Sequence, residues 1–174
     1  MFFEAQPAND GYVKIPRNAT NVGLYAFSCN NYCDVPDGIN WNDNTLFTTI
    51  PQYAFYYQAF EGEFRIPDHI TTIKNSAFYD PKFSKFTIPA SVTSIDGNFY
   101  CIAPDFASKV PNLTMIFESV TPPTFNSTPF YYLYKLTNER FSIYVPDESL
   151  ETYKAVSQLS NYLSYIKPMS QLPE

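Results

Sequence analysis

The chain has few of the residues on which catalytic and metal-binding sites usually depend. Its 174 residues include one histidine, one tryptophan, five glycines and three cysteines. Three cysteines do not make a disulfide scaffold. The single histidine, His69, has no Cys, Asp or Glu at ligand spacing, so we interpret it as a surface turn residue. No phosphate-binding loop, Gly-x-Ser-x-Gly elbow or glycine-rich dinucleotide turn occurs. We therefore expect a non-enzymatic protein with no catalytic residue, cofactor or metal.

Basic residues and long hydrophobic runs are also scarce. Eleven Lys and Arg against 17 Asp and Glu give a net charge of −6, which disfavours nucleic-acid and anionic-membrane partners, because both need clustered cations. No run approaches the roughly 18 apolar residues of a membrane helix, so we expect no membrane insertion. Met1-Phe2-Phe3 is too short for a secretory leader. Either the protein stays inside the cell, or a leader has been removed.

Aromatic residues and proline are abundant, and they recur in a short unit. The chain contains 15 Pro, 15 Tyr and 16 Phe. Within residues 64–100 the unit occurs twice with an offset of 22 residues, so that Phe64-Arg65-Ile66-Pro67 corresponds to Phe86-Thr87-Ile88-Pro89. Self-similarity at a period in the twenties is typical of a stacked repeat.

Two further copies precede this pair. The first starts at Val13. The second starts at Val35-Pro36 and ends with Ile50 and Ala54-Phe55, with about eight extra residues that we assign to an insertion at 37–45. The second aliphatic residue of each unit serves as a marker, and the four markers are Val22, Ile50, Ile73 and Ile95.

The unit has a simple physical interpretation. Phe64-Arg65-Ile66 alternates apolar and polar side chains as a strand does, and Pro67 ends the strand because it cannot donate a backbone hydrogen bond. We predict a repeat solenoid of five or six turns, a right-handed coil with a parallel β-sheet on one side and irregular turns. Residues 1–12 form an irregular N-terminal segment and residues 13–146 the solenoid.

Residues 147–174 are predicted to form a helical cap and tail. Asp147 stands where a helix cap is expected, and acidic residues fill the first turn of a helix at 147–156. Solenoids need a terminal unit that covers the open end of their core. We expect this helix to be that unit.

These repeats resemble the BspA-type leucine-rich repeat. The strings IPDHITTIKNSAF and IPASVTSIDGNFY carry the resemblance, and the terminal FSIYVPDESLETYKAV is similar to the closing unit of many such proteins from gut bacteria. The resemblance covers about residues 13 to 168. It implies a secreted or surface-attached recognition protein of the kind found in Bacteroides-group bacteria, with adhesion to host or matrix proteins or to other cells. It transfers no catalytic residue.

Two surfaces are candidates for binding an extracellular protein or glycan. Solenoids usually present the outward column of their sheet, which we assign to Lys14, Arg65, Thr87, Ile116 and Tyr144. Tyrosines give contact area at low entropic cost, and a second set comprises Tyr56, Tyr57, Tyr131, Tyr132 and Tyr134. The alternative for the sheet face is a solvated surface without a partner.

Several interpretations remain open at this point. Cys29 and Cys33 pack as small apolar residues or form a local bridge. The polar residues Asp34, Asp37, Asn40, Asn42, Asp43 and Asn44 surround Trp41, and they form either a polar excursion or a calcium site, although their order does not match an EF-hand. A nucleophilic pair of His69 and Cys101 is compatible with the residue types.

The functional alternatives belong to different classes. The main prediction is a secreted or cell-surface recognition protein of unknown oligomeric state. The alternative is a structural spacer that presents other domains of a larger surface protein, and the least favoured is an accessory domain of a carbohydrate-active enzyme.

Overall fold

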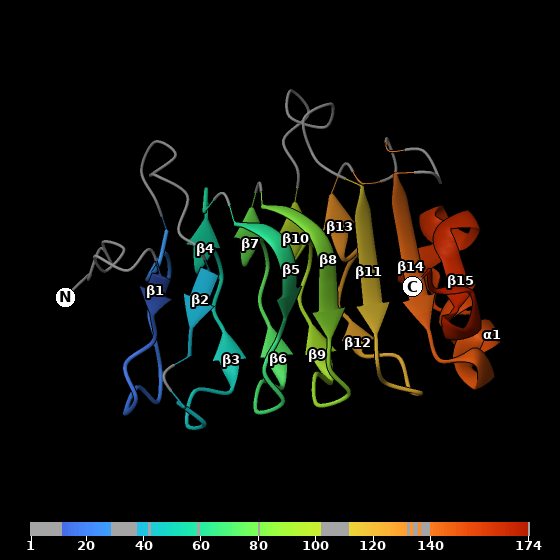
Figure 1. The fold of residues 1–174 in the computed structure, drawn as a ribbon. Helices are drawn as coiled ribbons and strands as arrows, with labels where there is room; N and C mark the ends of the chain where they lie inside the picture. The colour runs from blue at the N-terminus through green and yellow to red at the C-terminus, as the bar shows by residue number, and fades with distance from the viewer. Residues whose placement is uncertain are drawn as a thin grey trace.

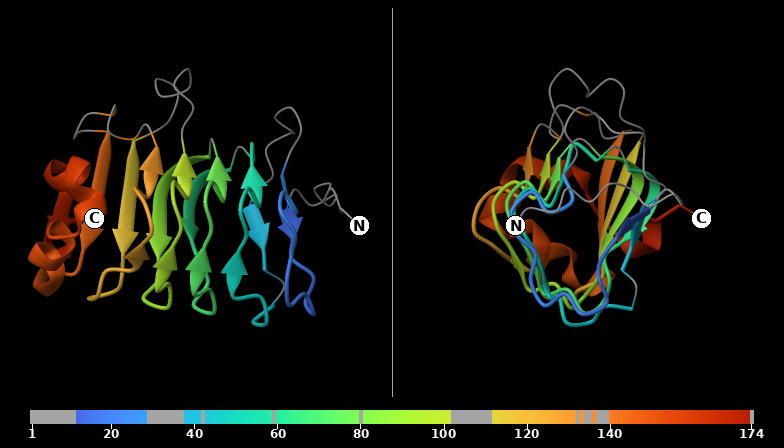
Figure 2. Two further views of the ribbon diagram at one scale, coloured as in Figure 1. Left: turned by 180° about the vertical axis from the view of Figure 1, so that it is seen from behind. Right: turned by 90° about the vertical axis from the view of Figure 1, so that its left-hand side faces the viewer.

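The protein is a coil whose turns stack along one axis from the N-terminus to the C-terminus (Figure 1). The computed structural model describes residues 12–28, 38–41, 43–58, 60–79, 81–101, 112–131, 133, 136 and 140–173. Three parallel sheets run along the coil, and the end-on view of Figure 2 shows them enclosing a common interior.

One turn of the coil contains three strands. In a central turn these are β5 (Glu61–Arg65), β6 (Thr72–Ile73) and β7 (Phe78–Tyr79), and the next turn repeats them as β8 (Lys82–Ile88), β9 (Ser94–Ile95) and β10 (Tyr100–Cys101). The other strands are β1 (Tyr12–Lys14), β2 (Gly38–Asn40), β3 (Thr49–Ile50), β4 (Phe55–Tyr56), β11 (Leu113–Phe117), β12 (Thr124–Phe125), β13 (Phe130–Tyr131), β14 (Phe141–Val145) and β15 (Ile166–Pro168).

Equivalent strands of successive turns pair in parallel. The long sheet has the order β15-β14-β11-β8-β5, the second sheet β12-β9-β6-β3 and the third sheet β13-β10-β7-β4, while β1 and β2 form a separate pair. The sequence predicted a sheet on one side, and that sheet is the long one. The second and third sheets were not predicted, because their strands are only two residues long and show no alternation.

The strand register confirms the correspondence between the repeats. Phe64 pairs with Phe86, and Phe78 pairs with Tyr100. The markers Ile50 and Ile73 also lie opposite each other. The repeat solenoid is therefore confirmed, whereas the right-handed sense of the coil and the domain limits stay predictions.

The structure corrects the interpretation of the second repeat. Gly38–Asn40, inside the predicted insertion at 37–45, form β2, and Val13 pairs with Ile39. Ile50 follows Ile39 by eleven residues, whereas Val22 follows Val13 by nine. After β2 the second repeat is therefore only two residues longer than the first, so little of the predicted insertion lies there. Val35 lies outside the described residues.

Aromatic rings fill the interior. Phe27, Phe55 and Phe78 stack on one another through successive turns, with ring centroids 5.5 and 5.2 Å apart. Phe78 also meets the Phe86 ring at 5.0 Å and has no exposed surface. Burial of each Phe side chain contributes about 1.5–3 kcal/mol. Since these rings are buried by contacts between turns, a turn gains this stability only when its neighbours are present.

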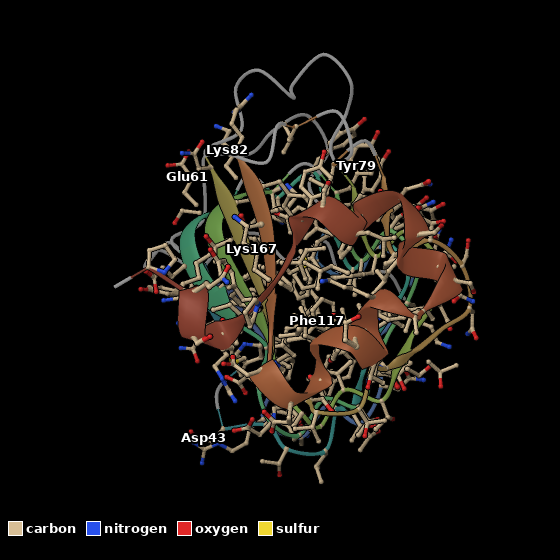
Figure 3. All side chains as sticks on the ribbon, turned by 90° about the vertical axis from the view of Figure 1, so that its right-hand side faces the viewer. Asp43, Glu61, Tyr79, Lys82, Phe117 and Lys167 are labelled. Carbon is tan, nitrogen blue, oxygen red and sulfur yellow. The ribbon has the colours of Figure 1, made fainter. Side chains whose placement is uncertain are left out.

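The C-terminal segment lies over the last turn of the coil (Figure 3). It comprises η3 (Asp147–Ser149), α1 (Leu150–Lys154), η4 (Ser157–Tyr165) and η5 (Met169–Gln171). Its tyrosine rings enter the core: Tyr153 lies 5.5 Å from the Phe117 ring and Tyr162 lies 5.1 Å from the Phe130 ring. No helix in the described part of the chain has the length and apolar character needed to cross a membrane.

The predicted helix at 147–156 is only partly α-helical. The five residues Leu150–Lys154 are α-helix, and Val156 is extended with ψ of 116°. Asp147 does not cap this helix. Its carboxylate instead accepts a hydrogen bond from the Ser170 backbone N–H at 2.9 Å, and its hydrogen bonds with Ser170 hold the pKa of Asp147 below its usual value.

Candidate functional site

The predicted row of outward residues exists on the long sheet. The register places Arg65 opposite Thr87, Thr87 opposite Ile116 and Ile116 opposite Tyr144. Lys14 lies in β1 and pairs with Asn40 of β2, and among the described residues no strand pairing joins this pair to the row. The row continues instead to Lys167 in β15.

Most of this row is covered. Thr87, Ile116 and Tyr144 are 8%, 6% and 4% exposed, whereas Arg65 is exposed. The ammonium group of Lys167 lies 5.8 Å from the Tyr144 ring centroid. Figure 2 shows the C-terminal end of the chain outside the long sheet. The role of these residues in binding stays a prediction, and of the four only Arg65 offers an exposed side chain.

The charged groups around this row bind one another. The Arg65 guanidinium donates to Glu118 Oε2 and to Asp68 Oδ1, both at 2.7 Å. These bonds raise the pKa of Arg65 and lower the pKa of Asp68. Along the sheet, Lys85 pairs with Glu63 and Lys82 with Glu61, each at 3.3 Å. Exposed pairs such as those of Lys85 and Lys82 contribute about 0.2–1 kcal/mol each to the stability of the fold. Because these charged groups already pair with one another, they favour the interpretation of the long sheet as a solvated face.

Five tyrosines gather on a different side of the coil, which we call the tyrosine cluster: Tyr25, Tyr53, Tyr56, Tyr57 and Tyr79. Tyr25 and Tyr53 stack with centroids 4.6 Å apart and an interplanar angle of 11°. The Tyr56 ring lies 4.3 Å from Tyr57 and 4.4 Å from Tyr79. Tyr25 is 46% exposed and the other four are half-buried. Figure 3 shows Tyr79 well away from Lys167 of the long sheet.

Three of these tyrosines have a backbone conformation that side chains disfavour. Their φ angles are +59° at Tyr25, +58° at Tyr53 and +56° at Tyr57. A residue with a Cβ atom in this left-handed region costs about 1–2 kcal/mol. Ser76, with φ of +51°, occupies the same place as Tyr25 and Tyr53, two residues before the core phenylalanine of its turn. Asn98, at the same place in the next turn, has no positive φ. The conformation therefore belongs to particular turns, and in one of them a small residue meets it.

Other tyrosines set the electrostatic surroundings of Tyr56. Burial raises the pKa of Tyr56, and the hydrogen bond with Tyr57 raises it further, followed by smaller effects of Tyr57, Tyr79 and Tyr25. Every side chain that shifts this pKa among the described residues is another tyrosine. The Tyr56 phenol thus keeps its proton at neutral pH, and the cluster presents ring carbons and hydroxyl groups.

The sequence predicted this surface in part. It selected Tyr56 and Tyr57 but missed Tyr25, Tyr53 and Tyr79. Two signals were present: a tyrosine two residues before a core phenylalanine, and a tyrosine directly after one. Of the other residues selected, Tyr132 and Tyr134 lie outside the described residues, as does the side chain of Tyr131.

A polar cleft of about 600 Å³ lies beside Trp41. It is lined by Asn40, Trp41, Asp43, Asn44, Thr45, Pro67 and His69. The His69 ring meets the Trp41 ring edge-on at 5.9 Å, and burial lowers the pKa of His69. His69 is therefore a half-buried packing residue rather than a simple surface turn residue.

Two polar side chains of this cleft have structural partners, whereas the buried Nε2 atom of His69 has no hydrogen-bond partner among the described residues. Asp43 forms an ion pair with Arg17 at 3.3 Å. The buried Asn44 amide donates to the carbonyl oxygens of Pro16 and Ala19, at 2.6 and 2.8 Å. No group of three or more His, Cys, Asp or Glu side chains suited to a metal ion occurs in the part of the chain that the structure describes.

Several residues named from the sequence cannot be placed in these sites. Asp34, Asp37 and Asn42 of the possible calcium loop lie outside the described residues, as do Cys29 and Cys33. The side chain of Cys101 is also outside them, so its pairing with His69 stays a hypothesis.

Comparison with known proteins follows the same repeats. Six copies of the BspA type leucine rich repeat region match the chain, over residues 8–107 and 48–148. A search of curated proteins found no match. The matched residues cover most of the chain and include strands β1 to β14 but not β15. The chain belongs to the BspA-type leucine-rich repeat family.

Proposed function

We propose that this protein is an exported, non-enzymatic recognition protein, secreted or held at a cell surface, that binds an extracellular partner through the tyrosine cluster. Membership in the BspA-type leucine-rich repeat family supports an extracellular role for the chain. The tyrosine cluster supports the contact surface, and it is the observation on which the proposal rests.

The backbone of the cluster favours a functional role. Residues held in disfavoured backbone conformations concentrate at binding and active sites. Ser76 shows that the same place in the coil accepts a small side chain. Compared with a tyrosine, this side chain loses the stacking energy of a ring but exposes no ring to solvent. Tyr25 instead exposes 46% of its surface. A bulky, exposed and strained residue is explained more simply by a ligand than by folding.

The chemistry of tyrosine suits recognition. Its ring gives a large contact area, its hydroxyl group gives a directional hydrogen bond, and its two side-chain torsions lose little entropy on binding. Tyrosine is also enriched among the residues that dominate the free energy of interfaces. Contacts between neighbouring rings hold the cluster in one arrangement before a ligand arrives, which lowers the entropic cost of binding.

The long sheet provides a second surface for the same function. Its predicted binding residues are Arg65, Thr87, Ile116 and Tyr144, with Lys14 in the separate β1–β2 pair. A ligand there would have to compete with Glu118 and Asp68 for the Arg65 guanidinium. We therefore favour the tyrosine cluster.

The C-terminal segment fits the role of a terminal cap. Residues 147–168 place Tyr153, Tyr162 and Tyr165 against the last core rings. The Tyr153 hydroxyl donates to the Ser119 carbonyl oxygen at 2.9 Å, so this covering layer is also bonded to the coil. We infer that the segment shields the core from water at this end.

A binding screen tests the proposed function. Purified protein is applied to immobilised extracellular-matrix proteins and to a glycan array, beside a Tyr25→Ala/Tyr56→Ala variant and an Arg65→Gln variant. We expect a ligand whose binding the tyrosine variant loses and the Arg65 variant keeps. Thermal unfolding of each variant serves as the control for folding.

The other outcomes are equally informative. Binding lost only in Arg65→Gln would move recognition to the long sheet. No ligand in either panel would contradict the recognition protein and favour the spacer that presents neighbouring domains.

A further inference from the structure

We propose that the tyrosine cluster binds an uncharged, proline-rich peptide segment in the polyproline II conformation. This inference rests on the proposed recognition function and adds the chemical class of the ligand.

The arrangement of the rings suits prolines better than flat sugar rings. Tyr25 and Tyr53 cover each other face to face, and Tyr56 lies within 4.4 Å of both Tyr57 and Tyr79. Neighbouring tyrosines thus occupy many of the faces on which a sugar would stack. The perpendicular pairs, Tyr53–Tyr56 at 90° and Tyr57–Tyr79 at 89°, form angled walls instead. Proline-rich segments dock between aromatic side chains of this kind.

The repeat distance of the coil matches that of the peptide. Parallel neighbours in a sheet are about 4.7–4.9 Å apart, so two turns of the coil advance by about 9.4–9.8 Å. A polyproline II helix rises by about 3.1 Å per residue and repeats its face every three residues, or about 9.3 Å. The outermost tyrosines, Tyr25 and Tyr79, belong to turns two steps apart. Tyr25 lies two residues before the core phenylalanine of its turn and Tyr79 one residue after, so the line between them runs obliquely across the turns by way of Tyr56, which lies 6.0 Å from Tyr25 and 4.4 Å from Tyr79. A segment that follows this line places residues i and i+3 beside the two rings.

Polarity and charge agree with this ligand. A polyproline II segment has no internal hydrogen bonds and exposes its carbonyl oxygens, which tyrosine hydroxyl groups can meet as donors. The groups that perturb Tyr56 are all phenols, so the cluster presents no full charge from those neighbours. An acidic peptide would in addition be repelled by the net charge of −6. The net charge thus disfavours an acidic partner, and the phenol surroundings of Tyr56 suit an uncharged one.

The test is a titration of the full chain with fluorescently labelled decaproline. A glycine-serine peptide of equal length is the control ligand, since it has no preformed polyproline II helix. We expect saturable decaproline binding that weakens about tenfold in Tyr79→Ala, which is typical of a residue that dominates an interface. Tyr25→Gly should weaken binding similarly while its backbone accepts the positive φ. Tyr12→Ala is the matched control, because Tyr12 is 40% exposed in β1, and it should bind as the unchanged chain does.

Three results would overturn the inference. The first is a decaproline titration without saturation up to about 1 mM, a dissociation constant that corresponds to a binding free energy near −4 kcal/mol. The second is equal binding of the glycine-serine peptide. The third is unchanged decaproline binding in both cluster variants. If decaproline fails but a matrix protein or glycan binds and is lost in Tyr25→Ala/Tyr56→Ala, the ligand class is wrong and the proposed function stands. If no ligand depends on the cluster, both are wrong.

Discussion

Replacement of Tyr53 by glycine and by alanine should reveal the backbone strain of the tyrosine cluster. Both changes remove the same ring contacts, namely the stack with Tyr25 at 4.6 Å and the edge contact with Tyr56 at 5.4 Å. The difference between the two variants therefore isolates the backbone. At φ of +58° the alanine Cβ is disfavoured, whereas glycine accepts this region freely.

The expected magnitude follows from two opposing terms. A Cβ in the left-handed region costs about 1–2 kcal/mol, and glycine loses about 0.5–1 kcal/mol of stability through its greater freedom when unfolded. Tyr53→Gly should thus be more stable than Tyr53→Ala by about 0.5–1 kcal/mol. Tyr56 lies in the extended strand β4 without a positive φ. There the order should reverse, and alanine should be the more stable by about 0.5–1 kcal/mol.

Thermal unfolding of the four variants measures this reversal. For a chain of this length, 1 kcal/mol corresponds to about 2–4 °C in Tm. We expect Tyr53→Gly to melt above Tyr53→Ala, and Tyr56→Gly below Tyr56→Ala. Alanine more stable than glycine at both positions would refute the strain, and with it one of the two reasons for assigning function to the cluster.

Three further changes test the coil itself. Asn44→Ala should lower the free energy of unfolding by about 3 kcal/mol in urea titrations, because four hydrogen bonds of about 0.5–1.5 kcal/mol net each are lost; a loss below about 1 kcal/mol would contradict the role of this amide. Phe78→Ala should cost about 3–5 kcal/mol and Phe78→Leu clearly less, since the ring is fully buried; equal costs would contradict the stacking account. The hydrogen-bonded ion pair with Lys74 at 2.6 Å lowers the pKa of Asp96 in the folded protein. Above the pKa of about 4 that Asp has in the unfolded chain, the ionised Asp96 therefore stabilises the fold. This stabilisation is lost as the pH falls through the lower pKa of the folded protein. The Tm difference between the wild type and Asp96→Asn should therefore be largest near neutral pH and shrink on acidification, and a pH-independent difference would contradict the assignment.

The elements that the sequence predicted are those whose signal is local. In Phe64-Arg65-Ile66 the alternation of apolar and polar side chains lies within one strand, and Pro67 marks its end. The recurrence at Phe86 then aligns the turns before any coordinate is known, as the pairing of Phe64 with Phe86 confirms. The family resemblance was recognised from the same repeats and is confirmed by the matching family model.

The elements that the sequence did not predict depend on neighbours in space. A two-residue strand such as β6 is held by hydrogen bonds to the turns on either side, for example from the Lys74 N–H to the Ile50 carbonyl oxygen at 2.9 Å. Ile39 in β2 has no proline three residues later, where Val13 and Phe64 have one, so its strand was assigned to a loop. The α-helix was predicted too long, because the extended Val156 turns the chain so that the following η4 can lay Tyr162 on the core.

The large aromatic content of the chain has two distinct causes, which the repeat separates. Positions that face inward hold phenyl rings, as at Phe27, Phe55 and Phe78, where the fold alone explains a large apolar side chain. The place two residues earlier has a positive φ in these three turns, which tyrosine meets poorly and Ser76 meets with a small, buried side chain. The packing of the core therefore gives no reason for the rings of Tyr25 and Tyr53. Their stack, exposure and strain all belong to the surface, and a ligand that contacts those rings supplies the reason that folding does not.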